Sequence, residues 1–197
     1  LMGGQACVLY GAAEFSRDVD LAIPADPRNL ARLRKALADL KAELIAVPPF
    51  DGSYLRRGHA IHFRCMNPEA ARIRIDVMSK MRGLEPFSKL WSRRTTLVLP
   101  GSLSCNLMAL PDLVKAKKTQ RDKDWPMIRR LLEAHYFQYQ TRPTWARTAF
   151  WMLELRTPEL LTEIAQRYPR ACRRLLAARP LLARALSGDL KEIAGKL

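Results

Sequence analysis

The sequence lacks several features that would assign it quickly to a class. No apolar run approaches the roughly 20 residues that a membrane-spanning helix needs. The N-terminus has no basic segment followed by an apolar stretch and a small-residue cleavage site. Neither a G-x-x-x-x-G-K-[ST] loop nor a G-x-G-x-x-G turn is present. These absences argue against a membrane span, an export signal, and P-loop or Rossmann nucleotide binding, and we expect a cytoplasmic protein.

Cysteines and acidic residues are also scarce. The four cysteines lie far apart without the paired spacing of zinc ligands, so we expect reduced thiols at Cys7, Cys65, Cys105 and Cys172. Asp and Glu number 19 against 34 Lys and Arg, which gives a net charge of +15 spread over both halves of the chain. This balance favours a polyanionic partner such as RNA or nucleotide phosphate, and solvated basic faces are the alternative.

The distribution of helix and strand signals divides the chain. Both types alternate up to about residue 110, and only helical signals follow. We therefore predict an α+β domain over residues 1–110 and a helical subdomain over residues 111–197. Leu1 and Met2 resemble the end of a strand, so we expect the natural chain to continue upstream.

The clearest local signals lie in the first domain. Asp26 has the character of an N-cap, Pro27 follows it, and apolar residues continue at helical spacing through Leu30, Leu33, Leu37, Leu40 and Leu44. Period-2 alternation or β-branched runs occur in residues 53–66, 71–78 and 95–101. We expect these three segments to form strands of one sheet.

The first residues combine glycines with a pair of aspartates. Residues 4–12 predict a short helix closed by Gly11, and residues 16–23 predict a strand. Gly3 and Gly4 stand at the helix start, where unpaired N–H groups and the absence of side chains allow a phosphate to approach. Asp18 and Asp20 point to the same face of the strand, and like charges so close favour a cation between them.

A third carboxylate extends this candidate site. Alternation divides residues 71–78 into an apolar face and a charged face, Ile73, Ile75 and Val77 against Arg72, Arg74 and Asp76. Three carboxylates on two strands suit a two-magnesium site for phosphoryl transfer. The alternative is an exposed strand on which Asp76 pairs with Arg74.

This arrangement resembles the nucleotidyltransferase superfamily, which has the DNA polymerase β-like fold. The resemblance implies an α+β fold with a mixed sheet. The shared pattern is Gly-Gly, about a dozen residues, Asp-x-Asp and a later strand aspartate. The chain is most similar to small prokaryotic nucleotidyltransferases, including toxins of toxin–antitoxin modules, in which a further segment follows the core, here Asp112, Leu113, Lys117, Arg121, Lys123 and Asp124. The resemblance covers roughly residues 3–133, and it departs at Glu14, where relatives often carry arginine two positions before a Ser or Thr.

The resemblance implies a role for each matched residue. Asp18 and Asp20 would bind two Mg²⁺ or Mn²⁺ ions, and Asp76 would bind one of them and help to activate the acceptor hydroxyl. Contacts to the phosphates of a nucleoside triphosphate (NTP), ATP or another, are expected from Gly3, Gly4, Ser16, Arg17, Lys115, Lys117, Arg121 and Lys123, with Lys118 beside them.

The implied activity is transfer of a nucleoside monophosphate from an NTP to a hydroxyl, with release of pyrophosphate. The basic charge favours an RNA acceptor, such as a tRNA end, over a protein side chain or a small molecule. The alternative is a non-catalytic nucleotide- or RNA-binding protein, or a component of a toxin–antitoxin-like module that binds a protein partner.

Other polar and aromatic groups have two interpretations. His59 and His62 are three residues apart on a predicted strand, so they point to opposite faces and cannot share a metal ion. The basic stretch at residues 115–123 is either a solvated helix end or a contact for phosphate or RNA. Four aromatic residues at helical spacing are either core residues or base-stacking platforms, namely Trp125, Trp145, Phe150 and Trp151.

Overall fold

The structure, a computed structural model, describes residues 1–118 and 124–197. They form two compact units, Leu1–Asp124 and Trp125–Leu197. The boundary predicted after residue 110 lies inside the first of these units, because the helix that begins at Leu110 belongs to it and buries Leu113 and Val114.

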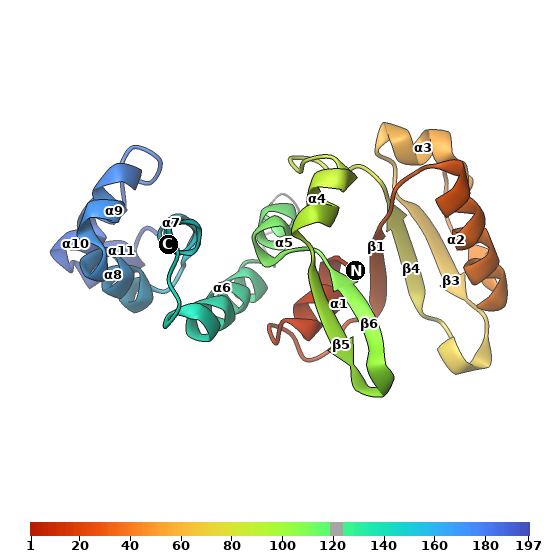
Figure 1. Ribbon diagram of the computed structural model, residues 1–197, viewed down its shortest axis with the longest axis horizontal. Helices are drawn as coiled ribbons and strands as arrows, with labels where there is room; N and C mark the ends of the chain where they lie inside the picture. Colours follow the sequence, from red (N-terminus) through yellow and green to blue (C-terminus); the bar gives the residue numbers. More distant parts are fainter. Residues whose placement is uncertain (119–123) are drawn as a thin grey trace. The chain divides into compact units, whose positions relative to one another are not determined.

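The first unit contains both helices and strands (Figure 1). Its strands are β1 (Asp18–Ala22), β2 (Ala42–Leu44), β3 (Ile61–Cys65), β4 (Arg74–Met78), β5 (Thr95–Leu99) and β6 (Leu103–Leu107). Its α-helices are α1 (Gly3–Leu9), α2 (Pro27–Asp39), α3 (Gly52–Arg57), α4 (Phe87–Arg93) and α5 (Leu110–Lys117). Short 3₁₀ turns cover Pro68–Ala70 and Pro100–Ser102.

The main sheet has the strand order β1-β4-β3-β2. Strand β1 is parallel to β4, and β3 is antiparallel to both β4 and β2, so the sheet is mixed, as the sequence predicts. Helices α2 and α3 lie beside this sheet in Figure 1. Their Leu30, Leu37 and Leu55 pack against Ile61 and Val77 from one face of the sheet. The opposite face is therefore left for polar side chains.

Two helix predictions in the first unit are confirmed by the ends of the helices. The carboxylate of Asp26 accepts a hydrogen bond of 2.9 Å from the amide of Asn29 and so caps α2. Gly11, with φ of +76°, follows the C-cap of α1. The assignment of Leu44 to the α2 stripe is wrong, because the chain turns after Asp39 and Leu44 lies in β2.

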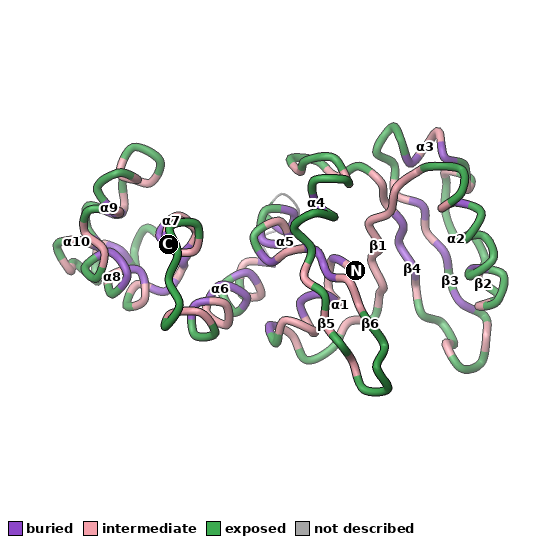
Figure 2. The backbone as a smooth tube through the Cα atoms, viewed as in Figure 1, coloured by how far each residue is buried: buried purple, intermediate pink, exposed green. Residues whose placement is uncertain are grey.

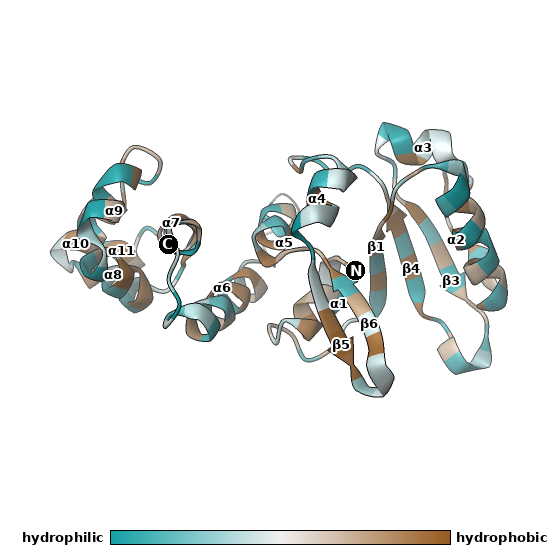
Figure 3. Cartoon of the chain, in the orientation of Figure 1, coloured by the Kyte–Doolittle hydropathy of each residue, from teal (hydrophilic) through white to brown (hydrophobic). Residues whose placement is uncertain are grey.

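Two strand predictions need correction. The segment over residues 53–66 is not one strand, because Asp51 caps a short helix, α3, and Gly58 in the left-handed region ends it before β3. Residues 95–101 do not join the main sheet. Strand β5 instead pairs with β6 in a separate two-stranded sheet. Val98 and Leu103 are exposed apolar residues of this hairpin. Figure 2 shows exposed segments in both strands, and Figure 3 shows β5 as largely hydrophobic.

The second unit consists of helices in the described residues 125–197, as predicted. They are α6 (Trp125–Tyr139), α7 (Trp145–Glu154), α8 (Pro158–Arg167), α9 (Pro169–Leu175), α10 (Leu182–Ser187) and α11 (Leu190–Ala194). Trp151 is fully buried and contacts Tyr136 edge-on, so it is a core residue, whereas Trp145 is exposed. No helix in the described part of the chain is long and apolar enough to cross a membrane.

The cysteines match the expectation of separate thiols. All four lie among the described residues and none forms a disulfide. Burial raises the pKa of the Cys7 thiol to about 11, so this side chain behaves as a small apolar core residue.

Candidate functional site

The register between β1 and β4 brings the predicted carboxylates together. Asp20 is paired with Asp76, and Asp18 is paired with Arg74. Residues directly opposite on neighbouring strands point to the same face of a sheet. The polar face of the sheet therefore carries Asp18, Asp20 and Asp76, while Ile75 and Val77 from β4 are buried on the other face.

Asp20 is held against the start of α1. The amide of Gly4 donates a hydrogen bond of 3.3 Å to Asp20 Oδ2, and the amide of Met2 donates one of 2.9 Å to the Asp20 carbonyl oxygen. Gly3 has φ of +62°, and a Cβ atom added there would lie 1.8 Å from Asp20 Oδ2. Only glycine fits at position 3, for reasons of both backbone conformation and space. In this structure a carboxylate occupies the helix start that the sequence suggests for a phosphate.

Gly4 and Ser16 form a second close contact. A Cβ atom at Gly4 would lie 2.5 Å from Ser16 Oγ, and Ser16 Oγ itself donates a hydrogen bond of 2.9 Å to the carbonyl oxygen of Asp18. Ser16 thereby fixes the backbone at the start of β1. The two glycines of the motif thus allow the α1 backbone to approach Asp20 and Ser16 closely.

Asp76 is bound by two neighbours. Its Oδ1 accepts a hydrogen bond of 2.7 Å from Arg74 Nε and lies 2.8 Å from Nδ1 of His62, which is its partner across the β3–β4 register. The hydrogen bond with Asp76 is the main cause that raises the pKa of Arg74 above its usual value. The alternative pairing of Asp76 with Arg74 is thus formed, at the same place where Asp76 adjoins Asp20.

The electrostatics of Asp20 reflect this crowding. Burial raises the pKa of its carboxyl above the ordinary value, and the charge of Asp76 raises it further. The hydrogen bond from Gly4 and the charge of Lys117 oppose these effects. The negative charge of ionised Asp20 is therefore incompletely balanced by its neighbours, and an additional cation would stabilise it.

The predicted phosphate-binding residues are divided by the structure. Lys117 is 6% exposed, 3.9 Å from Asp124 Oδ1, and near enough to Asp20 to affect its pKa. Lys115 is exposed, and two residues along a helix face nearly opposite directions, so it does not share the direction of Lys117. Lys118 and Arg17 are exposed as well. Arg121 and Lys123 lie outside the described residues.

The segment that follows the core is anchored by α4. Arg93 donates hydrogen bonds to both carboxylate oxygens of Asp112, at 3.0 and 2.9 Å, and forms an ion pair of 2.6 Å with Glu85. The first turn of α5 is thereby tied to the last turn of α4. This contact helps to orient α5, which carries Lys117.

The three carboxylates are chemically suited to bind a divalent cation, but their side chains do not converge closely enough to hold one. Carboxylate oxygens are the ligands that Mg²⁺ and Mn²⁺ prefer. Within residues 1–118 and 124–197, however, no three side chains of the His, Cys, Asp and Glu types converge closely enough to hold a metal ion. Asp76 Oδ1 contacts Arg74 instead, so Arg74 would compete with a metal ion for the negative charge of Asp76.

His62 is the residue of this site that sequence reasoning missed. The three-residue spacing of His59 and His62 excludes a shared metal ion on a strand and predicts no role for either residue. The spacing of His62 and Arg64 by two residues places them on one face of β3, but only the β3–β4 register shows that this face is the one that carries Asp76. No local pattern predicts such a register.

The chain matches no protein-family model and no curated protein sequence. The assignment of a function therefore depends on the geometry described above.

Proposed function

We propose that this protein is a metal-dependent nucleotidyltransferase of the DNA polymerase β-like fold. The observation that carries the proposal is the pairing of Asp20 with Asp76 on adjacent parallel strands, beside a Gly3 that has no room for a Cβ atom. Like charges on adjacent strands favour a cation between them. The mixed sheet and the order of the motif along the chain are consistent with this fold.

In the proposed reaction, the oxygen of an acceptor hydroxyl attacks the α-phosphorus of an NTP. The bond between that phosphorus and the oxygen bridging to the β-phosphate breaks, and pyrophosphate leaves. Asp18, Asp20 and Asp76 would hold Mg²⁺ or Mn²⁺, which when bound compensates the negative charge of the triphosphate. Asp76 accepts the hydroxyl proton, and Lys117 adds positive charge from the side of α5.

The acceptor we favour is RNA. The net charge of +15 supplies an attraction to polyanions that does not depend on base sequence. Nucleotidyl transfer and RNA binding depend on different groups. Transfer needs charge at the reacting oxygens, whereas RNA binding needs only the cations distributed over the protein.

The test is transfer by the full 197-residue chain. The chain is incubated with each α-labelled NTP, Mg²⁺ or Mn²⁺, and either total RNA or total protein, and the labelled pool is identified. We expect label in RNA, and we expect Asp20→Asn to lower the rate at least ~10²-fold, the scale of removing one preorganised electrostatic group. Binding of Mn²⁺, followed by paramagnetic resonance, should weaken in parallel.

A matched control is Glu43→Gln. Glu43 lies on β2, where it is exposed and paired with Arg64, so the variant removes a carboxylate at the far edge of the same sheet. Its transfer rate should stay within about twofold of the unmodified chain, as for most surface substitutions. Equal rates for Asp20→Asn and the unmodified chain would refute the proposed site. Retained RNA binding with no transfer to any acceptor would favour the non-catalytic alternative.

A further inference from the structure

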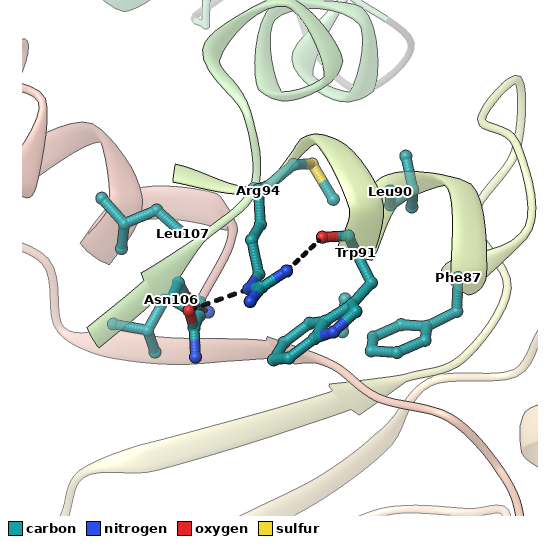
Figure 4. Close-up of a pocket in the computed structure, with 9 residues that line it drawn as sticks. Phe87, Leu90, Trp91, Arg94, Asn106 and Leu107 are labelled. Carbon is teal, nitrogen blue, oxygen red and sulfur yellow. Dashed lines mark hydrogen bonds between the residues drawn. The ribbon is translucent and has the colours of Figure 1, made fainter. Parts of the chain in front are cut away.

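Arginines of the first unit use their planar guanidinium groups in two different ways. Nε and Nη2 of Arg93 donate to the two carboxylate oxygens of Asp112, at 3.0 and 2.9 Å, so this pair is bidentate. Arg94, which stacks on the ring of Trp91, binds two separate acceptors, the side-chain oxygen of Asn106 and the carbonyl oxygen of Trp91 (Figure 4). A guanidinium in this protein therefore binds either both oxygens of one carboxylate or the acceptors of two residues.

Arg74 divides its donors between a carboxylate and a histidine. Its Nε donates to Asp76 Oδ1 at 2.7 Å, and its Nη2 lies 3.1 Å from Nδ1 of His62. Nε and Nη2 lie on the same edge of the guanidinium, so in a bidentate pair Nη2 would bind the second carboxylate oxygen, as it does in Arg93. In the described part of the chain, Asp76 Oδ2 makes no hydrogen bond. Nδ1 of His62 therefore takes the place of that oxygen.

The sheet holds these three side chains together. His62 is paired with Asp76 across β3 and β4, and Arg74 precedes Asp76 by two residues on the same face of β4. The side chains of His62 and Asp76 are 22% and 12% exposed, whereas that of Arg74 is 40% exposed. The histidine is thus enclosed beside the carboxylate, while the guanidinium has room to adopt another position.

The hydrogen-bond network assigns the ring proton of His62. A guanidinium has donors only, so an Nδ1 atom that faces Arg74 Nη2 is an acceptor, and the proton of the neutral ring lies on Nε2. Nδ1 and Asp76 Oδ1, which are 2.8 Å apart, are then two acceptors bridged by one cation. The two oxygens of Asp112 have the same relationship to Arg93.

We infer that His62 is a positioning residue that keeps Oδ2 of Asp76 free for a divalent cation, by accepting the Arg74 donor that would otherwise bind this oxygen. The inference rests on the proposed function, in which Asp76 is a metal ligand. A bidentate Arg74 would cover both oxygens of Asp76. With its donors divided, Arg74 offsets part of the charge of Asp76 and leaves one oxygen available.

The first measurement is binding of Mn²⁺ to the full chain, followed by paramagnetic resonance. We expect His62→Ala to weaken binding about 10- to 100-fold, the scale for residues that orient a metal ligand. His62→Asn should restore most of the affinity, because its amide oxygen can accept the Arg74 donor near the position of Nδ1. The matched control is His59→Ala, since His59 is exposed and precedes β3, and its affinity should not change. Unchanged affinity in His62→Ala would overturn the inference.

A double variant tests whether His62 acts through the guanidinium. Lysine at position 74 keeps the positive charge but has no planar pair of donors. We therefore expect His62→Ala combined with Arg74→Lys to bind Mn²⁺ nearly as well as Arg74→Lys alone. If the double variant binds as weakly as His62→Ala, His62 does not act through Arg74 and the inference fails.

Two further readouts need no metal ion. A crystal structure of His62→Ala should show Arg74 Nη2 bound to Asp76 Oδ2, and an Oδ2 that is still free of Arg74 would contradict the inference. Nitrogen-15 NMR of the neutral His62 ring in the unmodified chain should show a proton on Nε2 and none on Nδ1. A proton on Nδ1 would also overturn the inference, because this atom could not then accept from Arg74.

The outcomes separate this inference from the proposed function. If the unmodified chain binds no Mn²⁺, both fail. If Mn²⁺ binding depends on Asp20 but is the same in His62→Ala, only the inference fails. If binding depends on both residues and the double variant recovers it, both are supported.

Discussion

The two faces of the main sheet are built from alternate residues of the same strands, yet they differ in burial and in charge. Ile61, Ile75 and Val77 are at most 6% exposed and pack under α2 and α3. Their neighbours His62 and Asp76 lie on the other face, in contact with each other. The apolar face supplies the free energy of burial, and the charged face holds groups whose mutual repulsion and desolvation oppose folding. Buried apolar groups and charged groups are thus separated by one residue along each strand.

The largest effect on stability is expected for Ile61→Ala. Ile61 is fully buried, and removing its side chain leaves a cavity that costs about 2–5 kcal/mol of the free energy of unfolding. The adjacent variant His62→Ala should cost less than about 1 kcal/mol, because His62 lies on the polar face and is partly exposed. Urea denaturation of both variants measures the difference. Equal destabilisation would contradict the expectation that the apolar face contributes more to stability than the polar face.

The glycine at position 3 offers a sharper test on the charged face. Gly3→Ala forces an alanine into the left-handed region and drives its Cβ into Asp20 Oδ2, so we expect transfer to fall at least ~10-fold. Gly11→Ala is the matched control, since Gly11 also has positive φ but a Cβ there meets no atom within 4 Å. It should cost only the conformational strain of about 1–2 kcal/mol and leave transfer nearly unchanged. Similar activities of the two variants would show that the Gly3 contact is not functional.

The next prediction concerns Arg74, the cationic side chain that contacts Asp76 on the charged face. Arg74→Gln removes the guanidinium from Asp76, so we expect Mn²⁺ to raise the melting temperature more in this variant than in the unmodified chain. The control is Arg64→Gln, which removes an exposed arginine paired with Arg74 across the sheet. A few degrees of difference between the two variants is expected. A response to Mn²⁺ as small as that of Arg64→Gln would argue against competition between Arg74 and a metal ion.

The smallest effect is a pH dependence of stability. Because burial and Asp76 raise the pKa of Asp20 in the folded state, the unmodified chain loses stability as pH rises through that raised pKa. Asp20→Asn lacks this loss, so it should be more stable than the unmodified chain at pH 7 and show no gain in stability at pH 3, below the ordinary pKa of Asp. Melting curves without divalent cations, with Glu43→Gln as control, test the sign. A variant that is less stable at pH 7 would contradict it.

Local patterns in the sequence determined the elements whose stabilising contacts are themselves local. Asp26 caps α2 through an amide three residues away, Gly11 ends α1, and alternation separates Asp18 and Asp20 from Val19. The same reasoning predicted an α+β fold and a helical C-terminal part, and the mixed sheet was an expectation from the family resemblance. It was wrong where two signals overlapped, as in residues 53–66, because the cap at Asp51 and the left-handed Gly58 outweigh the strand-like alternation.

Only the tertiary structure decided which residues meet. The pairing of Asp20 with Asp76, the contact of His62 with Asp76 and the effect of the Lys117 charge on Asp20 join segments far apart in the sequence. The stack of Trp91 and Arg94 beside Ala22 likewise follows from the packing of α4 against β1 and β6. Strand register and helix packing are set by burial of the whole apolar core, whereas a sequence pattern records only which face each residue prefers. The sequence therefore specified the chemistry available to this protein, and the packing of its core determined which groups can act together.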